Sequence, residues 1–357
     1  MSVSTREGSP QFPTVASSVQ ASTGETMDAA IQVLQDHKKD WVVFTLRERV
    51  ALIDELIQDF FAISQRWVDA GQKAKGTAKI APGEEWLAGV YPVIKNLRQL
   101  RQSLLDIEIS GHPKIPGEVK TLANGQVVAP VFPLTTYDRI VFTGVTAEIW
   151  MEPGVTAEDL PQTQATLYKD TRHDGKVALV LGAGNVASIG PMDIFNKLFL
   201  EDQVVIIKMN PVNAYIGPLI EEAFHSLVEK GFLRVVYGGA AEGAYLCNHA
   251  GVDEIHITGS DKTFDAIVFG TGAEGAARKA ENRPLLTKRI TGELGNVSPV
   301  IVVPGEWSNS DLAYQAEHIV SMLTNNAGFN CNATRVVIMH KQWAQREQLV
   351  QKICDVL

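Results

Sequence analysis

One cysteine stands in a stretch whose composition suits a chemical role. Cys331 lies within residues 326–335, Asn-Ala-Gly-Phe-Asn-Cys-Asn-Ala-Thr-Arg, and the asparagines and glycine predict a turn. Before this turn, apolar residues recur at helical spacing: Leu312, Ala316, Ile319, Val320 and Leu323. Asparagine and glycine at 325–328 are expected to end that helix, and residues 335–339 predict a buried strand. A thiol between a helix and a strand is rigidly supported, as a nucleophile must be.

A packing role is the main alternative for this cysteine, because free cysteines are among the most buried residue types. A second polar stretch, Thr-Gly-Glu-Leu-Gly-Asn-Val-Ser-Pro at 291–299, favours a chemical role instead. The two stretches resemble the cysteine and glutamate motifs of the aldehyde dehydrogenase superfamily, in the same order and at a similar separation. One position departs from that pattern, because Phe329 stands where the family often has glutamine.

The resemblance implies that an aldehyde is oxidised to a carboxylic acid through a cysteine thiohemiacetal and thioester. Cys331 would attack the carbonyl as a thiolate. The side-chain amide of Asn185 and the backbone N–H of Cys331 would hold the oxyanion. Glu293 would activate the water that releases the acid. An isolated glutamate at a strand end is more often solvated or ion-paired, so the catalytic role depends on the surrounding Gly-Glu-Leu-Gly motif.

A glycine-rich turn at 182–187 predicts a nucleotide site. Gly-Ala-Gly-Asn-Val-Ala follows an apolar strand, as in a dinucleotide-binding fingerprint. That fingerprint requires an acidic residue at the end of the next strand, where it binds a ribose hydroxyl. Lys208 stands there instead. The resemblance accommodates this lysine, because the superfamily uses a variant nucleotide fold in which a lysine contacts the adenosine ribose.

The resemblance also assigns the remaining cofactor contacts. Gly259 and Ser260 match the segment where the pyrophosphate meets a helix N-terminus, an anion site formed by backbone N–H groups. Gly184 and Leu294 complete the expected cofactor-binding set with the lysine. The expected cofactor is NAD or NADP. Pro211 stands where NAD-preferring members often carry an acidic residue, which leaves NADP open.

Two other functions remain open on the sequence. A reductase of acyl-CoA or another acyl thioester would keep the fold and run the thioester chemistry in reverse. A non-catalytic paralogue would bind a nucleotide or a partner without turnover. In favour of this last possibility, the superfamily continues well beyond the position matched by Leu357, so the resemblance predicts an incomplete catalytic domain.

The predicted fold class is α/β, with a variant Rossmann nucleotide domain, an N-terminal helical layer and the start of a second α/β domain. Apolar strands alternate with helices from residue 176 onward, which indicates a parallel sheet covered on both faces. The expected strands are 176–181, 203–208, 234–237, 254–258 and 288–291. The helical layer is expected at 27–40, from a Thr45–Glu48 capping box onward, and at 84–106.

The chain divides into three predicted parts. Residues 1–25 are rich in Ser, Thr, Pro and Gly and are predicted to form a disordered tail. Residues 26–292 are expected to hold the helices, a hairpin and the nucleotide-binding domain, and 293–357 the beginning of the catalytic domain. A connector is predicted at 109–136. A hairpin is predicted after it, with strands at 139–143 and 146–151. In the resembled family such a hairpin contributes to an oligomerisation sheet, so a homo-oligomer is expected for the full-length form.

Composition restricts the partners. The net charge of −9 over 357 residues argues against nonspecific nucleic-acid binding, because that needs a basic face. The three cysteines are widely spaced, so neither a disulfide framework nor a metal site is predicted. No uncharged apolar run is long enough for a membrane span. A small-molecule aldehyde or acyl substrate and a cytoplasmic location are expected, with organellar import still open.

Overall fold

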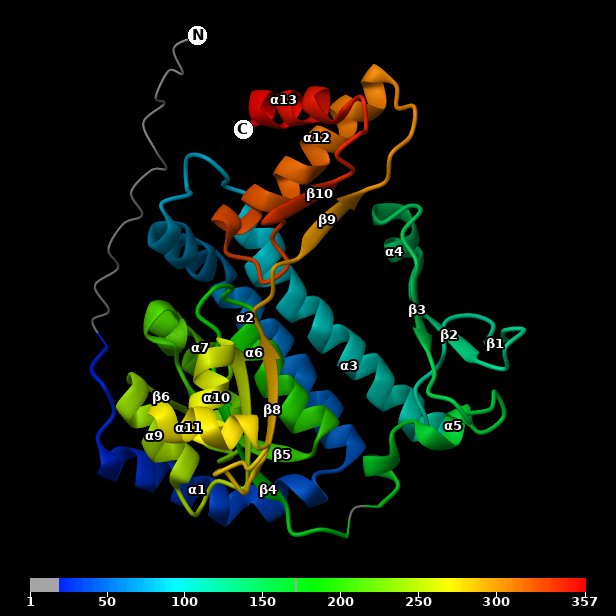
Figure 1. Cartoon of the computed structure of the whole chain (residues 1–357). Coiled ribbons are helices and arrows are strands. Elements are labelled where there is room, and N and C mark those ends of the chain that lie inside the picture. Colours follow the sequence, from blue (N-terminus) through cyan, green and yellow to red (C-terminus); the bar gives the residue numbers. More distant parts are fainter. Residues whose placement is uncertain (1–18, 171) are drawn as a thin grey trace.

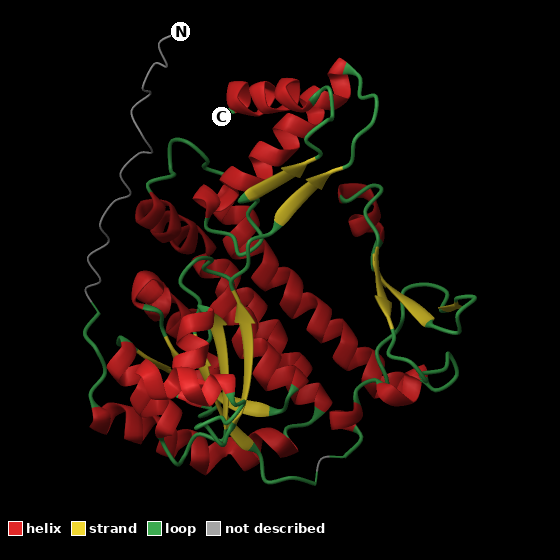
Figure 2. Cartoon of the chain, viewed as in Figure 1, coloured by secondary structure: helices red, strands yellow, loops and turns green. Residues whose placement is uncertain are grey.

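The structure is a computed structural model that describes residues 19–170 and 172–357. Its centre is a five-stranded parallel sheet with the strand order β6-β5-β4-β7-β8, and helices lie on both faces of it (Figures 1 and 2). The strands are β4 Lys176–Leu181, β5 Gln203–Lys208, β6 Leu233–Val236, β7 Glu254–Gly259 and β8 Arg289–Leu294. This is the Rossmann-like α/β fold that alternating strands and helices predict.

All five predicted strands are confirmed. Their near-continuous apolar sequences suit strands that are covered on both faces. β5 is buried along its whole length, and β4 is buried except at Lys176. β8 starts one residue later than predicted and extends to Leu294. The predicted division of the chain between residues 292 and 293 falls inside β8 and stays a prediction.

Three long helices form the predicted N-terminal layer. They are α1 Gly24–Val43, α2 Leu46–Lys75 and α3 Tyr91–Ser110, the last preceded by the π-helical turn η1 Trp86–Val90. The predicted capping box is confirmed at the start of α2. The Thr45 hydroxyl accepts a hydrogen bond from the Glu48 backbone N–H, and the Glu48 carboxylate accepts one from the Thr45 backbone N–H.

The predicted tail is only partly tested, because residues 1–18 lie outside the described residues. Its predicted end at residue 25 is wrong, since α1 begins at Gly24. The side chain of Thr23 caps this helix by accepting a hydrogen bond from the Thr26 backbone N–H at 3.2 Å. The helix therefore starts before the apolar residues that signalled it.

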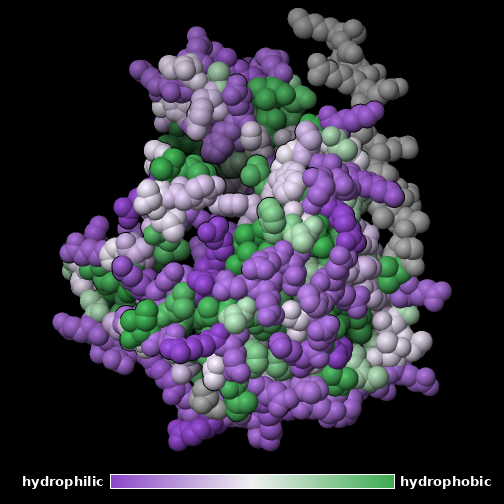
Figure 3. Space-filling model, turned by 180° about the vertical axis from the view of Figure 1, so that it is seen from behind, coloured by the Kyte–Doolittle hydropathy of each residue, from purple (hydrophilic) through white to green (hydrophobic). Residues whose placement is uncertain are grey.

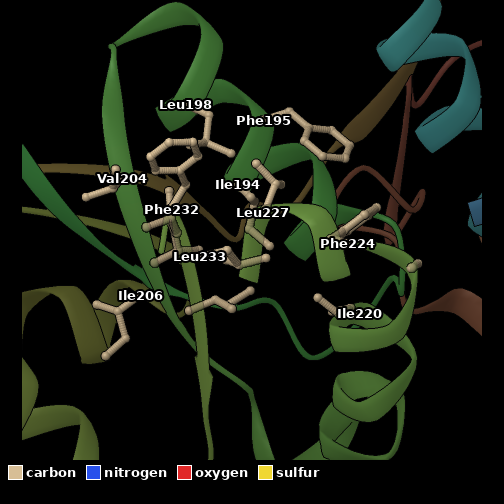
Figure 4. Packing of buried hydrophobic residues seen from close by; sticks show 14 of the residues in the cluster. Ile194, Phe195, Leu198, Val204, Ile206, Ile220, Phe224, Leu227, Phe232 and Leu233 are labelled. Carbon is tan, nitrogen blue, oxygen red and sulfur yellow. The ribbon is translucent and has the colours of Figure 1, made fainter. Parts of the chain in front are cut away.

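One large core joins the helical layer to the sheet. Trp41 of α1 is fully buried, and its indole N–H donates to the Leu198 carbonyl at 3.1 Å. Its ring also packs edge-on against the Phe232 ring, with the ring centroids 5.0 Å apart, a geometry that aromatic pairs favour. Figure 4 shows the part of this core around β5 and β6, with its labelled residues coming from the strands and from the helices beside them.

The other elements connect the strands or lie beside the sheet. They are α5 Leu160–Thr163, η2 Thr166–Tyr168, α6 Ile189–Phe195, η3 Asn196–Leu200, η4 Pro211–Ile216, α7 Gly217–Ala223, α8 His225–Glu229, α9 Ala240–Asn248, α10 Asp261–Phe269 and α11 Gly272–Ala280. α6 passes directly into η3, a π-helical turn, between β4 and β5. This segment borders the candidate site described below.

The predicted hairpin is wrong in its first strand. Residues 139–143 lie mostly in helix α4 (Thr136–Val141), because Thr135 and Asp138 form a capping box that starts a helix there. The second strand exists as β3 (Ala147–Trp150), but it pairs antiparallel with β2 (Val127–Phe132). β2 and β1 (Lys120–Thr121) lie in the segment predicted as a connector, so that prediction is also wrong.

The C-terminal part forms a small second α/β unit. The parallel strands β9 (Pro299–Val302) and β10 (Val336–Met339) pack with helices α12 (Asn309–Thr324) and α13 (Arg346–Val356). A separate small core holds them together: Val302, Leu312, Ala316, Ile319, Trp343 and Leu349. Both helices lie on the same side of the two strands (Figure 1). Ile301 and Ile338 remain exposed, so the strand predicted at 335–339 exists as β10 but is not buried, and that part of the prediction is wrong.

Seen from behind, the surface is mostly hydrophilic, with hydrophobic patches between the polar residues (Figure 3). Exposed apolar side chains include Ile149 and Trp150 of β3 and Ile140 of α4. Among the described residues, no helix combines the length and the hydrophobicity needed to cross a membrane.

An acid-sensitive ion cluster lies at the amino-terminal end of the sheet. Burial by itself raises the pKa of Glu254, but hydrogen bonds from Lys176 and Arg289 outweigh it and lower that pKa to about 2. The ordinary value is 4.5. The stabilisation from this carboxylate is therefore complete above pH 4.5 and is lost as the pH falls towards 2.

We expect the urea midpoint of the wild-type protein to fall more steeply between about pH 5 and about pH 3 than that of Glu254→Gln, which has no carboxyl group to protonate. Glu229→Gln, at an exposed position in α8, provides the matched control and is expected to follow the wild-type curve. Parallel curves for the wild type and Glu254→Gln would contradict the assignment.

Candidate active site

The candidate site lies at the carboxyl-terminal edge of the parallel sheet. The chain adds β5 and β6 on one side of β4, and then returns to add β7 and β8 on the other side. The connections after β4 and β7 therefore leave this edge in opposite directions, and such a switch point opens a crevice. A cleft of about 470 Å³ lies there, which is a volume typical of small-molecule sites.

The cleft brings together predicted site residues from four separate segments of the chain. Six of the predicted site residues line it: Gly184, Asn185, Gly259, Glu293, Leu294 and Cys331. They come from the turn after β4, the ends of β7 and β8, and the segment after α12. The other two predicted residues, Lys208 and Ser260, are not among its lining residues.

The cysteine segment, residues 326–335, follows a helix that ends as predicted. α12 stops at Thr324, and η5 (Asn325–Gly328) follows it. Asn326, Ala327 and Gly328 have φ angles of 53°, 52° and 76°. Asparagine and glycine adopt this left-handed conformation readily, whereas the sequence gives no signal for it at the alanine. The turn directs the chain towards the cleft.

The three cysteines differ in their surroundings. Cys331 is exposed and lines the cleft, so packing does not account for it. Cys247 of α9 is buried instead, and burial raises the pKa of its thiol to about 11. Cys354 of α13 is exposed outside the cleft. The described structure therefore offers one thiol inside the cleft and one exposed thiol that can serve as a reference.

Asn185 ties the first turn of the nucleotide domain to the cysteine segment. Its side-chain Nδ2 donates to the Phe329 carbonyl at 3.0 Å. In the other direction, Nδ2 of Asn326 donates to the Asn185 carbonyl at 3.0 Å. A side-chain amide carries two N–H donors, so one N–H of Asn185 remains for a ligand oxygen.

A buried ion pair supports the same segment from the helical layer. Nζ of Lys75, at the end of α2, donates both to the Glu85 carboxylate and to Oδ1 of Asn326. Glu85 is only 1% exposed. The neighbouring Glu84 carboxylate accepts the Asn326 backbone N–H at 2.8 Å. These contacts fix the start of the cysteine segment, and no sequence motif indicated the three charged residues.

Glu293 projects from β8 between two cavities. It lines the cleft and also a second cavity of about 440 Å³, whose other walls come from α3, α6, η3 and β7. The side chain is exposed, and within residues 19–170 and 172–357 it forms no ion pair. The alternative of an ion-paired carboxylate therefore has no support in the described structure, whereas exposure is compatible with both a solvated and a catalytic carboxylate.

Lys208 lies at the end of β5, where its carbonyl accepts a hydrogen bond from the Gly182 backbone N–H in the turn after β4. Its side chain is buried, and Nζ donates to the carbonyls of Met209 and Gly238 at 3.2 and 2.9 Å. Burial lowers the pKa of this lysine, although the Glu242 carboxylate opposes the shift. An ammonium has three donors, and the two carbonyls use two of them.

The surroundings of the cleft offer hydrogen-bond donors for a nicotinamide dinucleotide. Ser260 caps the N-terminus of helix α10, and its hydroxyl accepts the Lys262 backbone N–H at 3.1 Å. Other N–H groups of that first turn have no partner within the helix, which favours an anion. Asp261 in the same turn is a negative charge that opposes a phosphate. Gly184 admits no side chain, because a Cβ there would lie 2.9 Å from the side chain of Asn210.

Comparison with known proteins identifies relatives of this chain. Residues 200–356 match the aldehyde dehydrogenase family model. Aldehyde dehydrogenase LUC3 of Fusarium sp is 29% identical over 172 residues, which are 47% of this chain and 34% of that protein. Human 4-trimethylaminobutyraldehyde dehydrogenase is 31% identical over 137 residues, which are 38% of this chain and 24% of that protein.

Solved structures show the same fold. A mutant of aldehyde dehydrogenase C from Pseudomonas syringae, in complex with NAD+ and octanal, superposes with a TM-score of 0.61 at 15% identity. That match covers 94% of this chain and 55% of the other. NADP-dependent glyceraldehyde-3-phosphate dehydrogenase from Bacillus halodurans, complexed with NADP, gives a TM-score of 0.58 at 19% identity, over 95% of this chain and 58% of that enzyme.

The chain thus spans just over half the length of these solved enzymes. The sequence match, the shared fold and the two motifs around the cleft agree with one another. Residues 200–356 of the chain thus match the aldehyde dehydrogenase family, and the fold is that of the solved aldehyde dehydrogenases.

Proposed function

We propose that this protein oxidises an aldehyde to a carboxylic acid with NAD or NADP, using Cys331 as the nucleophile. One observation carries the proposal. The cleft at the switch point holds a thiol, a side-chain amide and a carboxylate, from Cys331, Asn185 and Glu293. These are the groups needed to form, stabilise and hydrolyse a thioester.

The first step forms a carbon–sulfur bond. The Cys331 thiolate attacks the aldehyde carbon, and the carbonyl oxygen becomes an oxyanion. The remaining Nδ2 hydrogen of Asn185 and the Cys331 backbone N–H stabilise this charge. The amide is held in place by its bond to the Phe329 carbonyl, so little reorganisation is needed when the charge develops.

A bound nicotinamide dinucleotide supplies the hydride acceptor that converts the thiohemiacetal into a thioester. Glu293 then removes a proton from a water molecule, and the resulting hydroxide attacks the thioester carbon. The carbon–sulfur bond breaks, which releases the acid and restores the thiolate of Cys331. The absence of an ion pair to Glu293 among the described residues leaves its carboxylate available for this proton.

The cofactor is expected to lie across the edge of the sheet. Gly184, Gly259 and Leu294 line the cleft and would contact the nicotinamide side, while Ser260 at the start of α10 would face the pyrophosphate. Lys208 has one donor left for a ribose hydroxyl. Two similar enzymes were solved with NAD+ and with NADP, and either dinucleotide is proposed for this chain.

Replacement of Glu293 by glutamine tests the proposal. We expect Glu293→Gln to lower steady-state turnover by about a hundredfold or more, because a general base contributes at least that much. The acyl group should remain on Cys331, and intact-protein mass spectrometry should detect it. Glu306→Gln, at an exposed position between β9 and α12, should behave like the wild type.

Two results would redirect the proposal. Full turnover of Glu293→Gln would contradict the role of Glu293 as the base. Turnover that requires coenzyme A or another thiol, and that is unchanged in Glu293→Gln, would favour transfer of the acyl group to a thiol over hydrolysis.

A further inference from the structure

The second cavity, which Glu293 also lines, has a wall that is mostly polar. Its apolar surface comes from Ile189, Met192 and Leu200, on the segment α6–η3. Its remaining wall is polar: Asn96, Asp193, Asn196, His256 and Glu293. Glu293 and Ile189 also line the cleft that holds Cys331. A substrate whose carbonyl reaches the thiol can therefore extend its tail past Glu293 into this cavity.

The charge in this cavity is negative. Asp193 and Glu293 are its two carboxylates, and neither lysine nor arginine is among its lining residues. Asp193 accepts a hydrogen bond from the Thr258 hydroxyl at 3.0 Å and lies 3.5 Å from Nε2 of His256. Nδ1 of that histidine lies 2.8 Å from the Thr291 hydroxyl. The partners of Asp193 are thus a neutral hydroxyl and an imidazole.

The nearest lysine on the same segment does not neutralise this charge. Lys197 is buried, and its Nζ lies 2.8 Å from the Glu201 carboxylate and 3.5 Å from the Thr291 hydroxyl. It is therefore already paired. Within residues 19–170 and 172–357, no lysine or arginine forms an ion pair with Asp193.

Asn96, a residue of the cavity wall, carries an acceptor without a partner among the described residues. Oδ1 of Asn96, in α3, is buried and forms no hydrogen bond among the described residues. A buried acceptor without a donor costs free energy. Asn96 and Asp193 therefore favour a guest that carries N–H or O–H donors.

We propose that the second cavity selects aldehydes that carry a terminal ammonium group, and that Asp193 is the residue that binds this group. This inference rests on the proposed aldehyde oxidation. An ammonium supplies the missing positive charge and the missing donors together. Carboxylate and phosphate tails are disfavoured, because they need arginine or lysine and here would meet two carboxylates. An alkyl tail would leave Asp193 and Asn96 without donors.

Steady-state kinetics with two substrates of nearly equal shape test the proposal. 3-Aminopropanal and butanal differ only in exchanging an ammonium for a methyl group. We expect kcat/KM of the wild-type protein to be about tenfold or more higher for 3-aminopropanal. Succinate semialdehyde, with an anionic tail, should be the poorest of the three. A wild-type preference for butanal or for succinate semialdehyde would overturn the inference.

Substitution then assigns the preference to Asp193. Asp193→Asn keeps an acceptor for the Thr258 hydroxyl but removes the charge. It should lower the ratio of the two kcat/KM values by about tenfold or more, while Asp193→Glu should keep the ratio above one. Asp174→Asn removes an equal charge from an exposed ion pair with Lys39 and should leave the ratio unchanged. An unchanged ratio in Asp193→Asn would overturn the assignment.

Binding of propylammonium, which has no aldehyde, separates this inference from the proposed function. If no aldehyde is turned over but NMR titration shows propylammonium binding that Asp193→Asn loses, the catalytic proposal fails and the ammonium site stands. If aldehydes are turned over without preference for the ammonium, this inference fails and the catalytic proposal stands. If wild-type protein neither turns over aldehydes nor binds propylammonium, both fail.

Discussion

Replacing Cys331 by alanine is expected to lower aldehyde oxidation on the order of a thousandfold or more, because the nucleophile takes part in every covalent step. Alanine removes only the sulfur from an exposed position, so the fold and the affinity for the dinucleotide should be kept. Steady-state rates and a dinucleotide titration on the same preparation would separate loss of chemistry from loss of binding.

The matched control is Cys354→Ala. Cys354 is also exposed, but it lies in α13 and does not line the cleft. It should retain wild-type rates within a factor of about two. Equal losses in the two variants would show that the cleft does not distinguish Cys331, and the proposed mechanism would then be wrong.

The second large effect is expected at Lys75, which is distant in sequence from every predicted motif. Its ammonium pairs with Glu85, which is 1% exposed. Oε2 of Glu85 already lacks a hydrogen-bond partner among the described residues. Lys75→Met would leave this carboxylate buried and unpaired, and such a loss costs about 3–5 kcal/mol. Urea unfolding of the variant should show a decrease of that size in the free energy of unfolding.

Two further variants identify the cause of the stability loss in Lys75→Met. Lys73→Met changes an exposed lysine earlier in the last turn of α2 and should have little effect on stability. The double variant Lys75→Met with Glu85→Gln removes the unpaired charge and should recover part of the lost stability. No recovery in the double variant would mean that the cost comes from packing rather than from the buried carboxylate.

Lys75→Met should also lower the catalytic activity. Lys75 donates to Oδ1 of Asn326, and Asn326 holds the Asn185 carbonyl from the cysteine segment. Loss of the lysine therefore releases the segment at its start. At a temperature where Lys75→Met is still folded, turnover should fall more than dinucleotide affinity does, since the thiol and the amide lose their relative position.

The parallel sheet could be predicted because its strands are short apolar runs between helical segments. β4 and β5 match their predicted bounds, since a strand buried on both faces has an unmistakable composition. The first hairpin strand could not be excluded in this way, because Ile140, Val141 and Phe142 form a continuous apolar run of residues that favour strands. The capping pair Thr135 and Asp138 was the signal for a helix there.

The candidate site was predictable where it depends on local motifs. Asn185, Glu293 and Cys331 each stand in a recognisable stretch, and the structure places all three on one cleft. Their supports depend on contacts between distant segments, such as the one from Lys75 to Asn326. No spacing in the sequence reports such a contact. The second cavity was missed for the same reason, because it forms only where α3 meets α6 and the sheet.

The most direct test of the central claim compares the two exposed thiols in one sample. The protein is treated with a limiting amount of an aldehyde-like electrophile, with and without NAD or NADP, and the labelled cysteines are identified by mass spectrometry. We predict that Cys331 is labelled well ahead of Cys354 and that one dinucleotide changes its rate alone. Cys247, which is buried, should stay unlabelled. Equal labelling of Cys331 and Cys354, unaffected by either dinucleotide, would contradict a formed catalytic site in this chain.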